Sequence, residues 1–181
     1  MPLDQIPDAE LLKRAVRGDE LAFTELYRRR QGGIFRFALQ MTGSQHVAEE
    51  VTQEVFMAVI RGMNAFDSAR GSVQAWLYGI ARNCVLRHFR RERTALPLGE
   101  MADVGVLSSS RDDSIDAVRR AVLALPEPFR EAVVLCDLQE LTYQEAADAL
   151  GVPIGTVRSR VSRGRGMLAS FFRSRDVRCV V

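Results

Sequence analysis

Residues 142–167 read TYQEAADALGVPIGTVRSRVSRGRGM, and this segment constrains the fold more than any other part of the chain. An apolar stripe at helical spacing marks a first short helix and consists of Ala146, Ala147 and Leu150. Gly151 favours the end of that helix, because glycine tolerates the left-handed backbone at a helix C-terminus. Pro153 suits the first turn of a following helix, where a missing N–H costs little. The segment therefore predicts two helices joined by a tight turn.

The second of these helices has an apolar side and a small polar side. At about 100° per residue, the apolar side consists of Val157, Val161, Gly164 and Leu168. The opposite side consists of Ser159, Ser162 and Gly166, with Arg163 close by and Arg158, Arg160 and Arg165 on the flanks. Small outward residues let a base edge approach, and guanidinium groups bind phosphates or guanine. This pattern is typical of a helix-turn-helix, whose second helix enters the DNA major groove. The alternative is an arginine-rich surface helix.

Helical periodicity dominates the rest of the chain, without the alternation that strands require. The expected helices are Asp8–Arg17, Glu20–Arg30, Gly33–Thr42, a helix capped by Ser44 that runs to about Met63, and Ser72–Arg91. Residues 94–114 contain Pro97, Gly99 and Gly105 without amphipathic spacing, which is typical of a linker. We therefore expect an all-α fold with two small helical domains, residues 1–93 and 115–175, and a tail at 176–181.

The charge is unevenly distributed along the 181 residues, although the net charge is only +2. Residues 61–93 hold seven basic and two acidic side chains, and residues 151–181 hold seven and one. The intervening residues 94–150 hold four basic and eleven acidic side chains. Two basic segments separated by an acidic one indicate two separate contacts with a polyanion.

Composition narrows the class of protein further. A hydrophobic share of 47% indicates a globular chain, and no stretch is long and apolar enough to insert into a membrane. The N-terminus lacks the pattern of a secretory signal, so we expect a cytoplasmic protein. The three cysteines form no C-x-x-C pair, which indicates neither a zinc site nor a disulfide framework. We expect Cys84 and Cys136 to be core residues.

Three segments, in this order, resemble a known family. EEVTQEVFMAVI (residues 49–60) is similar to region 2.2 of the extracytoplasmic-function sigma factors of bacterial RNA polymerase, a branch of the sigma-70 family. WLYGIARNCVLRHFRR (76–91) resembles regions 2.3–2.4, and residues 124–165 resemble region 4. The resemblance covers nearly the whole chain and implies region 2 in residues 1–93 and region 4 in residues 115–175.

The acidic residues of segment 49–60 lie on helix faces away from its valines. Three acids on one exposed helix suit a basic protein surface better than DNA, although charge runs are usually solvated faces. The resemblance implies docking on the β′ clamp helices of core polymerase, with a further contact to the β flap. The residues implied in core binding are Glu49, Glu50, Gln53, Glu54 and Phe56.

Aromatic and basic residues alternate in segment 76–93, which suits single-stranded or melted DNA. The resemblance implies that this segment and the loop before it capture an unstacked base of the promoter −10 element. The residues implied are Asn64, Asp67, Ser68, Ser72, Trp76, Arg82, Asn83, Arg87, Arg90 and Arg91. For Trp76 a role as a core anchor is the stronger alternative.

In the helix-turn-helix, the resemblance implies contacts with the promoter −35 element. The residues implied are Thr156, Arg158, Ser159, Arg160, Ser162, Arg163 and Arg165. The periodicity of the helix agrees for Ser159, Ser162 and Arg163. Gly164 and Gly166 each weaken the helix by roughly 1 kcal/mol relative to alanine, so the end of this helix is expected to order fully only when DNA or a partner is bound.

The leading hypothesis is a sigma factor that binds core polymerase and promoter DNA and is controlled by an anti-sigma factor. It requires no cofactor, metal or small-molecule substrate, because the polymerase carries the chemistry. A helix-turn-helix regulator that does not replace the sigma subunit is the alternative, but it leaves residues 44–93 unexplained. A nucleic-acid enzyme is disfavoured, since we find no Walker A loop, metal-ligand cluster or catalytic triad.

Overall fold

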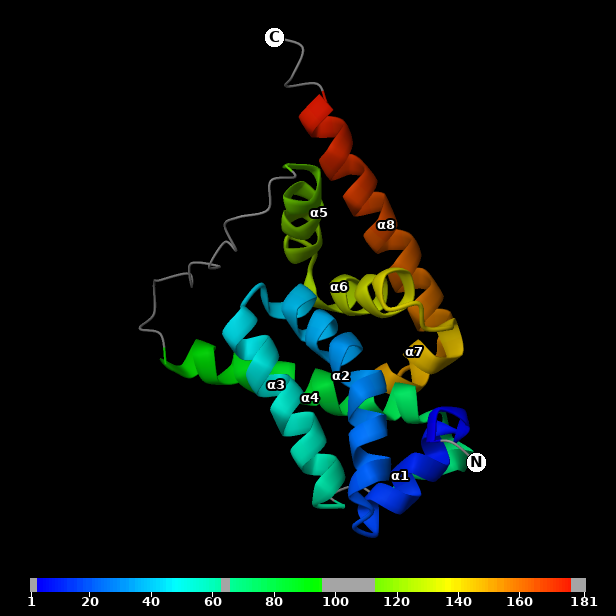
Figure 1. Ribbon diagram of the computed structural model, residues 1–181. Coiled ribbons are helices and arrows are strands. Elements are labelled where there is room, and N and C mark those ends of the chain that lie inside the picture. Colours follow the sequence, from blue (N-terminus) through cyan, green and yellow to red (C-terminus); the bar gives the residue numbers. More distant parts are fainter. Residues whose placement is uncertain (1–2, 63–65, 96–112, 177–181) are drawn as a thin grey trace.

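The computed structural model describes residues 3–62, 66–95 and 113–176, and the regular elements in this part of the chain are all helical (Figure 1). They are, in order, η1 (Leu3–Gln5), α1 (Asp8–Val16), α2 (Glu20–Thr42), α3 (Gln45–Ile60), η2 (Ser68–Arg70), α4 (Val73–Ala95), α5 (Asp113–Leu123), α6 (Glu127–Val133), the π-helical η3 (Val134–Leu138), α7 (Tyr143–Leu150) and α8 (Ile154–Asp176). The expected all-α fold is confirmed.

Several helix ends follow from local sequence signals. The Ser44 hydroxyl accepts the Val47 N–H at 3.3 Å, as expected for the N-cap of α3. At the start of α7, the Thr142 hydroxyl accepts the Glu145 N–H at 3.2 Å, and the Glu145 carboxylate accepts the Thr142 N–H at 3.0 Å. This reciprocal pair is a capping box. Gly151 ends α7 with φ of 65°, the left-handed conformation predicted for it.

The predicted break between two helices near residues 31–33 was wrong, because α2 is a single helix from Glu20 to Thr42. Gly33 has a tertiary role instead. A Cβ at this position would lie 2.7 Å from the Tyr78 hydroxyl of α4. The glycine therefore permits close packing of α2 on α4, at a cost of about 1 kcal/mol in helix propensity.

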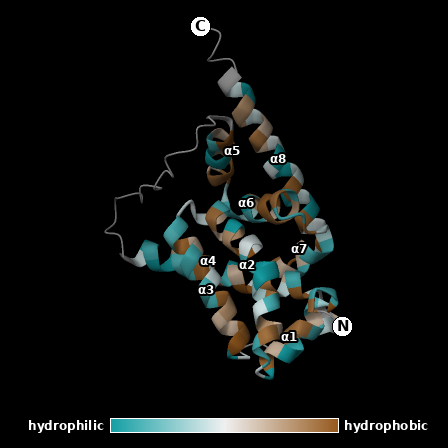
Figure 2. Cartoon of the chain, viewed as in Figure 1, coloured by the Kyte–Doolittle hydropathy of each residue, from teal (hydrophilic) through white to brown (hydrophobic). Residues whose placement is uncertain are grey.

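Two helical units, α1–α4 and α5–α8, make up the fold, and they pack against each other. Helix α4 packs against α2 and α3 on one side and against α7 of the second unit on the other. Phe37, Leu77 and Leu135, one residue each from α2, α4 and η3, belong to one continuous buried cluster. Figure 2 shows hydrophobic residues on the inner sides of the helices and hydrophilic residues outside. The hydrophobic core is thus shared by both units.

The ends of the linker segment differ slightly from the expectation. Helix α4 continues to Ala95 rather than ending near Arg91, and α5 begins at Asp113. Residues 96–112, the bulk of the expected linker, lie outside the described residues, as do Asn64, Cys179 and the tail from residue 177.

Candidate nucleic-acid and protein interfaces

Helix α8 is fixed in the second unit by a narrow strip of small and branched residues. Val157, Val161 and Gly164 are buried, as the sequence predicted. Helix α8 packs mainly against α6, and it also packs against α7, as expected. A Cβ on Gly164 would lie 2.5 Å from the Val133 side chain and 3.4 Å from the Phe129 carbonyl oxygen. Gly164 therefore brings α8 onto α6, and α8 is helical to Asp176 without a partner molecule.

The opposite side of α8 is free for a ligand. Ser159, Ser162 and Arg163 are exposed, and a Cβ added at Gly166 would meet none of the described residues within 4 Å, so this face is both small and open. Arg158 is exposed on its flank, while Thr156 and Arg160 are half-buried. Among the residues that the structure describes, no carboxylate pairs with Arg158 or Arg163, so their guanidinium groups remain available for phosphates or base edges.

Arg165 is placed differently from the other arginines of α8. Its Nε and Nη2 donate to the two carboxylate oxygens of Asp137 at 3.0 and 2.6 Å. Hydrogen bonding to Asp137 raises the pKa of Arg165. This bidentate pair joins α8 to η3. The Arg165 guanidinium would have to leave Asp137 to make the predicted −35 contact.

The aromatic and basic side chains of α4 point in several directions. Trp76 is half-buried and packs on Phe66, with ring centroids 5.8 Å apart, which matches the core-anchor interpretation. Asn83, Arg90 and Arg91 are exposed. Arg87 forms an ion pair with Glu54 of α3, and hydrogen bonding to Glu54 raises the pKa of Arg87. Asp67 and Ser68 are exposed just before α4, and the Asp67 carboxylate caps the turn by accepting the Ala69 N–H.

Two of the predicted −10 residues face the second unit. The Arg82 Nε donates to the Glu131 carboxylate of α6 at 2.6 Å. The Ser72 hydroxyl donates to the Glu145 carboxylate of α7 at 3.0 Å. Glu131 is 1% exposed, and this burial raises the pKa of its carboxyl group. The hydrogen bond from Arg82 acts in the opposite direction and lowers the pKa. These contacts join the predicted −10 helix to the unit that carries the helix-turn-helix.

The predicted core-binding helix α3 presents its acids as expected. Glu49, Glu50, Gln53 and Glu54 are all exposed. Phe56 is not, because it is 3% exposed and packs edge-on against Tyr27 of α2, with ring centroids 4.7 Å apart. Phe56 therefore packs beneath the exposed acids of α3 and is not itself part of the exposed surface.

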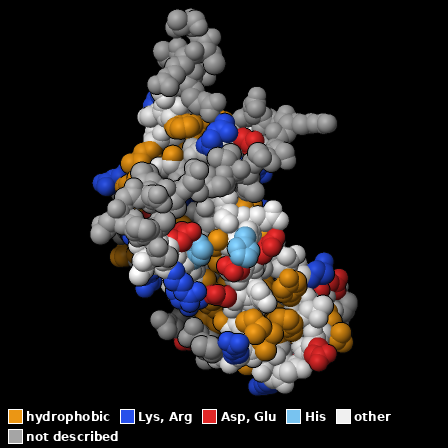
Figure 3. Space-filling model, turned by 90° about the vertical axis from the view of Figure 1, so that its left-hand side faces the viewer, with side chains coloured by type: hydrophobic (Ala, Val, Ile, Leu, Met, Phe, Trp, Pro, Cys, Tyr) orange, Lys and Arg blue, Asp and Glu red, His pale blue; other side chains and the backbone are white. Residues whose placement is uncertain are grey.

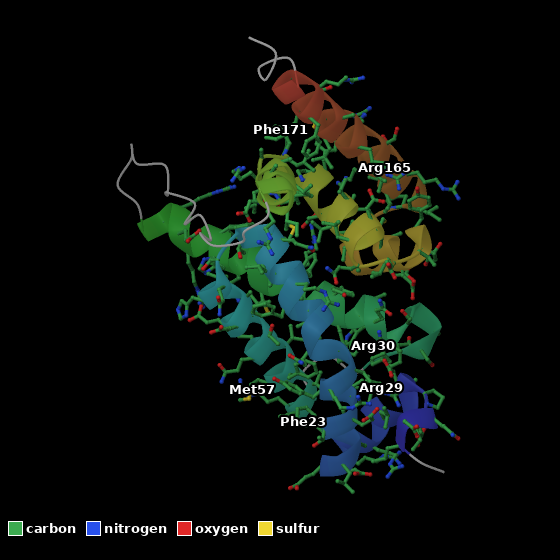
Figure 4. The ribbon with its side chains drawn as sticks, turned by 45° about the horizontal axis from the view of Figure 1, so that its top comes forward. Phe23, Arg29, Arg30, Met57, Arg165 and Phe171 are labelled. Atoms are coloured by element: carbon green, nitrogen blue, oxygen red, sulfur yellow. The ribbon has the colours of Figure 1, made fainter. Side chains whose placement is uncertain are left out.

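Sequence reasoning missed an apolar surface beside these acids. Tyr27, Met57 and Ile60 are 41%, 38% and 55% exposed. Hydrophobic side chains gather in the lower part of the face shown in Figure 3, and Figure 4 labels Met57 on α3 and Phe23 on α2. We call Tyr27, Met57 and Ile60 the apolar patch. The i, i+3 spacing of Met57 and Ile60 was visible in the sequence, but their exposure depends on how α2 and α3 pack.

The two cysteines that the structure describes are shielded from solvent. Cys84 is buried and Cys136 half-buried, and burial raises the pKa of each thiol to about 11. Within the described ranges, no group of three or more His, Cys, Asp or Glu side chains is arranged to hold a metal ion. In the same ranges, no helix has the length and hydropathy needed to span a membrane.

The chain matches two family models, described as Sigma-70 region 2 (residues 26–95) and Sigma-70, region 4 (residues 115–168). It is 37% identical over 166 residues to the ECF RNA polymerase sigma factor SigE of Mycolicibacterium smegmatis, an alignment that covers 85% of this chain and 64% of that protein. It is 36% identical over 166 residues to the ECF RNA polymerase sigma factor SigM of Mycobacterium tuberculosis, covering 90% of this chain and 83% of that protein.

A solved structure has the same fold. It is the sigma factor RpoE in complex with the anti-sigma factor NepR from Bartonella quintana, with a TM-score of 0.67 and 24% identity. The match covers 83% of this chain and 96% of that chain. Two family models in the predicted order, together with relatives aligned along most of their length, settle the family: the chain belongs to the ECF sigma factors of the sigma-70 family.

Proposed function

We propose that this chain is a cytoplasmic sigma subunit that binds core RNA polymerase and directs initiation at specific promoters. It performs no catalysis itself. Residues 1–93 act as the core-binding and −10 unit, and residues 115–175 act as the −35 unit. The observation that carries the proposal is the exposed face of α8, held outward by buried Val157, Val161 and Gly164, on the same chain as the acidic helix α3.

Each surface suits a different ligand on physical grounds. Ser159, Ser162 and Arg163 suit a major groove, because small side chains admit the DNA and guanidinium groups bind guanine or phosphate. The exposed acids of α3 lie next to the apolar patch, and such a combination suits a protein partner with basic and hydrophobic groups. We therefore assign α3 and the patch to core polymerase.

An anti-sigma factor is the proposed regulator. The support is that the structurally similar RpoE was solved in complex with the anti-sigma factor NepR. The contacts by which such a partner would bind this chain stay a prediction. This part of the proposal is tested by purifying the tagged chain and asking whether a co-purifying protein inhibits transcription that depends on the chain.

Transcription in vitro tests the main proposal. Purified core polymerase, with and without the chain, is given a library of genomic promoter fragments, and the transcript starts are sequenced. We expect a set of starts that depends on the chain and shares paired −10 and −35 sequences. Binding of the chain to free core separates a sigma factor from a regulator that leaves the sigma subunit in place. No chain-dependent start and no core binding would overturn the proposal.

A further inference from the structure

The Asp137 carboxylate lies at the edge of the outward face of α8. Its two oxygens accept hydrogen bonds from Nε and Nη2 of Arg165 at 3.0 and 2.6 Å. Among the arginines of α8 whose side chains the structure describes, Arg165 alone is hydrogen-bonded to a carboxylate. The chain itself therefore neutralises one of the arginines that are predicted to meet DNA.

Arg165 is placed where the backbone of bound DNA is expected. It follows Arg158 by seven residues, which is within about 20° of two full helical turns, so the two arginines share one flank of α8. The exposed Ser162 lies three residues before Arg165, one turn along the same helix. The Arg165 side chain is 57% exposed even in the ion pair. A guanidinium released from Asp137 would therefore have access to DNA that is bound against Ser162.

Asp137 is held by a well-buried part of the fold. It belongs to the π-helical η3, in which the Gln139 N–H donates to the Val134 carbonyl, five residues earlier, at 2.9 Å. Val134 and Leu135 of the same segment are buried in the core. Single π-helical turns occur frequently at functional sites. The Asp137 carboxylate is thus presented to α8 from a fixed position.

A carboxylate in this position competes with DNA for the same donors. The planar guanidinium group forms the same forked pair with a carboxylate as with a phosphate. Both donors of Arg165 that face Asp137 are already satisfied by charge-assisted hydrogen bonds. Moving to a DNA phosphate would break two such bonds in order to form two, so Arg165 gains little by leaving Asp137.

We infer that Asp137 is a positioning residue, whose carboxylate holds Arg165 away from DNA phosphates and lowers the sequence-independent part of DNA binding by α8. Phosphate contacts supply affinity for any DNA, whereas base contacts supply the choice of sequence. With Arg165 held back, a larger share of the binding depends on the base-facing Ser159, Ser162 and Arg163. The inference rests on the proposed DNA-binding role of α8 and goes beyond it.

The test is a mutant cycle on the full chain. The variants are Asp137→Ala, which frees Arg165, Asp137→Glu, which keeps a carboxylate, Arg165→Ala, and the double variant Asp137→Ala with Arg165→Ala. Glu140→Gln is the matched control, because it removes one negative charge from an exposed residue three positions after Asp137. Fluorescence anisotropy with a short labelled duplex of random sequence gives the affinity at several salt concentrations. Circular dichroism checks the folding of each variant.

We expect Asp137→Ala to bind this duplex about fivefold more tightly at about 0.1 M salt, as for one added phosphate contact. The plot of log affinity against log salt concentration should become steeper by about 0.9 for the same reason. Asp137→Glu and Arg165→Ala should both keep the wild-type slope. A pair that only fastens α8 to the fold predicts the opposite sign, because Asp137→Ala would then weaken DNA binding.

The double variant separates Arg165 from a general effect of charge. In the Arg165→Ala background, we expect Asp137→Ala to change affinity no more than Glu140→Gln does. A full gain in that background, or no gain from Asp137→Ala in the wild-type background, overturns the inference. If Asp137→Ala fails to fold, Arg165→Ala decides, since a shallower slope would show that Arg165 contacts DNA in the wild type.

Failure of this inference and failure of the proposed function give different results. Transcription that depends on the wild-type chain, without tighter DNA binding by Asp137→Ala, overturns the role of Asp137 alone. Tighter DNA binding by Asp137→Ala, from a chain that neither binds core polymerase nor directs initiation, upholds the role of Asp137 and overturns the proposed function.

Discussion

At the scale of single residues, two glycines with the same weak helix propensity can have different roles in packing. Gly164 and Gly166 lie two residues apart on α8, but a Cβ on Gly164 would lie 2.5 Å from Val133, whereas Gly166 has open space around it among the described residues. We expect Gly164→Ala to destabilise the second unit by about 1 kcal/mol, because overpacking exceeds the gain in helix propensity. Gly166→Ala, the control, should stabilise by up to about 1 kcal/mol. Thermal unfolding followed by circular dichroism measures both, and equal effects contradict the packing argument.

The second prediction at this scale concerns Glu25. Hydrogen bonds from Arg28 and Arg29 lower the pKa of Glu25 from 4.5 to about 2. A carboxylate whose folded pKa is lowered stabilises the fold above its unfolded pKa and loses that contribution as the pH falls towards the folded value. We expect wild-type stability to decrease between about pH 4.5 and pH 2, and Glu25→Gln to lessen this decrease. Unfolding midpoints across that range measure it, and parallel pH profiles for the two proteins would contradict the assignment.

At the scale of one element, some arginines of α8 are free to contact DNA and another holds the helix in the fold. Arg163 has an open surrounding, whereas Arg165 binds Asp137 in a bidentate pair. We expect Arg163→Ala to lower transcription from a chain-dependent promoter about tenfold or more, the usual cost of losing a base contact. Arg173→Ala, an exposed position nearer the end of the helix, is the control and should change little. A larger loss from Arg165→Ala than from Arg163→Ala would show that the outward face has been misassigned.

At the scale of the whole molecule, the apolar patch on α2 and α3 is exposed beside the acids of α3. Exposed hydrophobic groups beside charged ones mark protein contacts. We expect Met57→Asp to weaken binding to core polymerase about tenfold or more, while Met57→Leu, which keeps an apolar side chain, binds normally. Titration of core with labelled chain measures both, with circular dichroism as the check on folding. Normal core binding by Met57→Asp would show that core polymerase binds another surface of the chain.

The comparison of sequence and structure is most instructive where a local rule and a tertiary contact compete. Ser44, Thr142 and Gly151 mark helix ends through interactions with their immediate neighbours, so their roles were predictable. The sequence predicted separate helices on either side of residues 31–32, yet α2 continues through them, and Gly33 leaves the space that the Tyr78 hydroxyl of α4 occupies. The family resemblance implied a core-binding role for Phe56, but its side chain is buried and packs against Tyr27 of α2. Such contacts join residues far apart in sequence, and no local pattern encodes them.

By itself, the sequence determined the all-helical class, most of the helix ends and the outward face of α8, because helical periodicity and caps act over a few residues. Only the tertiary structure decided which predicted contacts are free. It paired Arg82 with Glu131, 49 residues apart, and Tyr78 with Gln139, 61 residues apart. The physical reason is that burial and pairing depend on which surfaces meet, and here the two units meet over the face of α4.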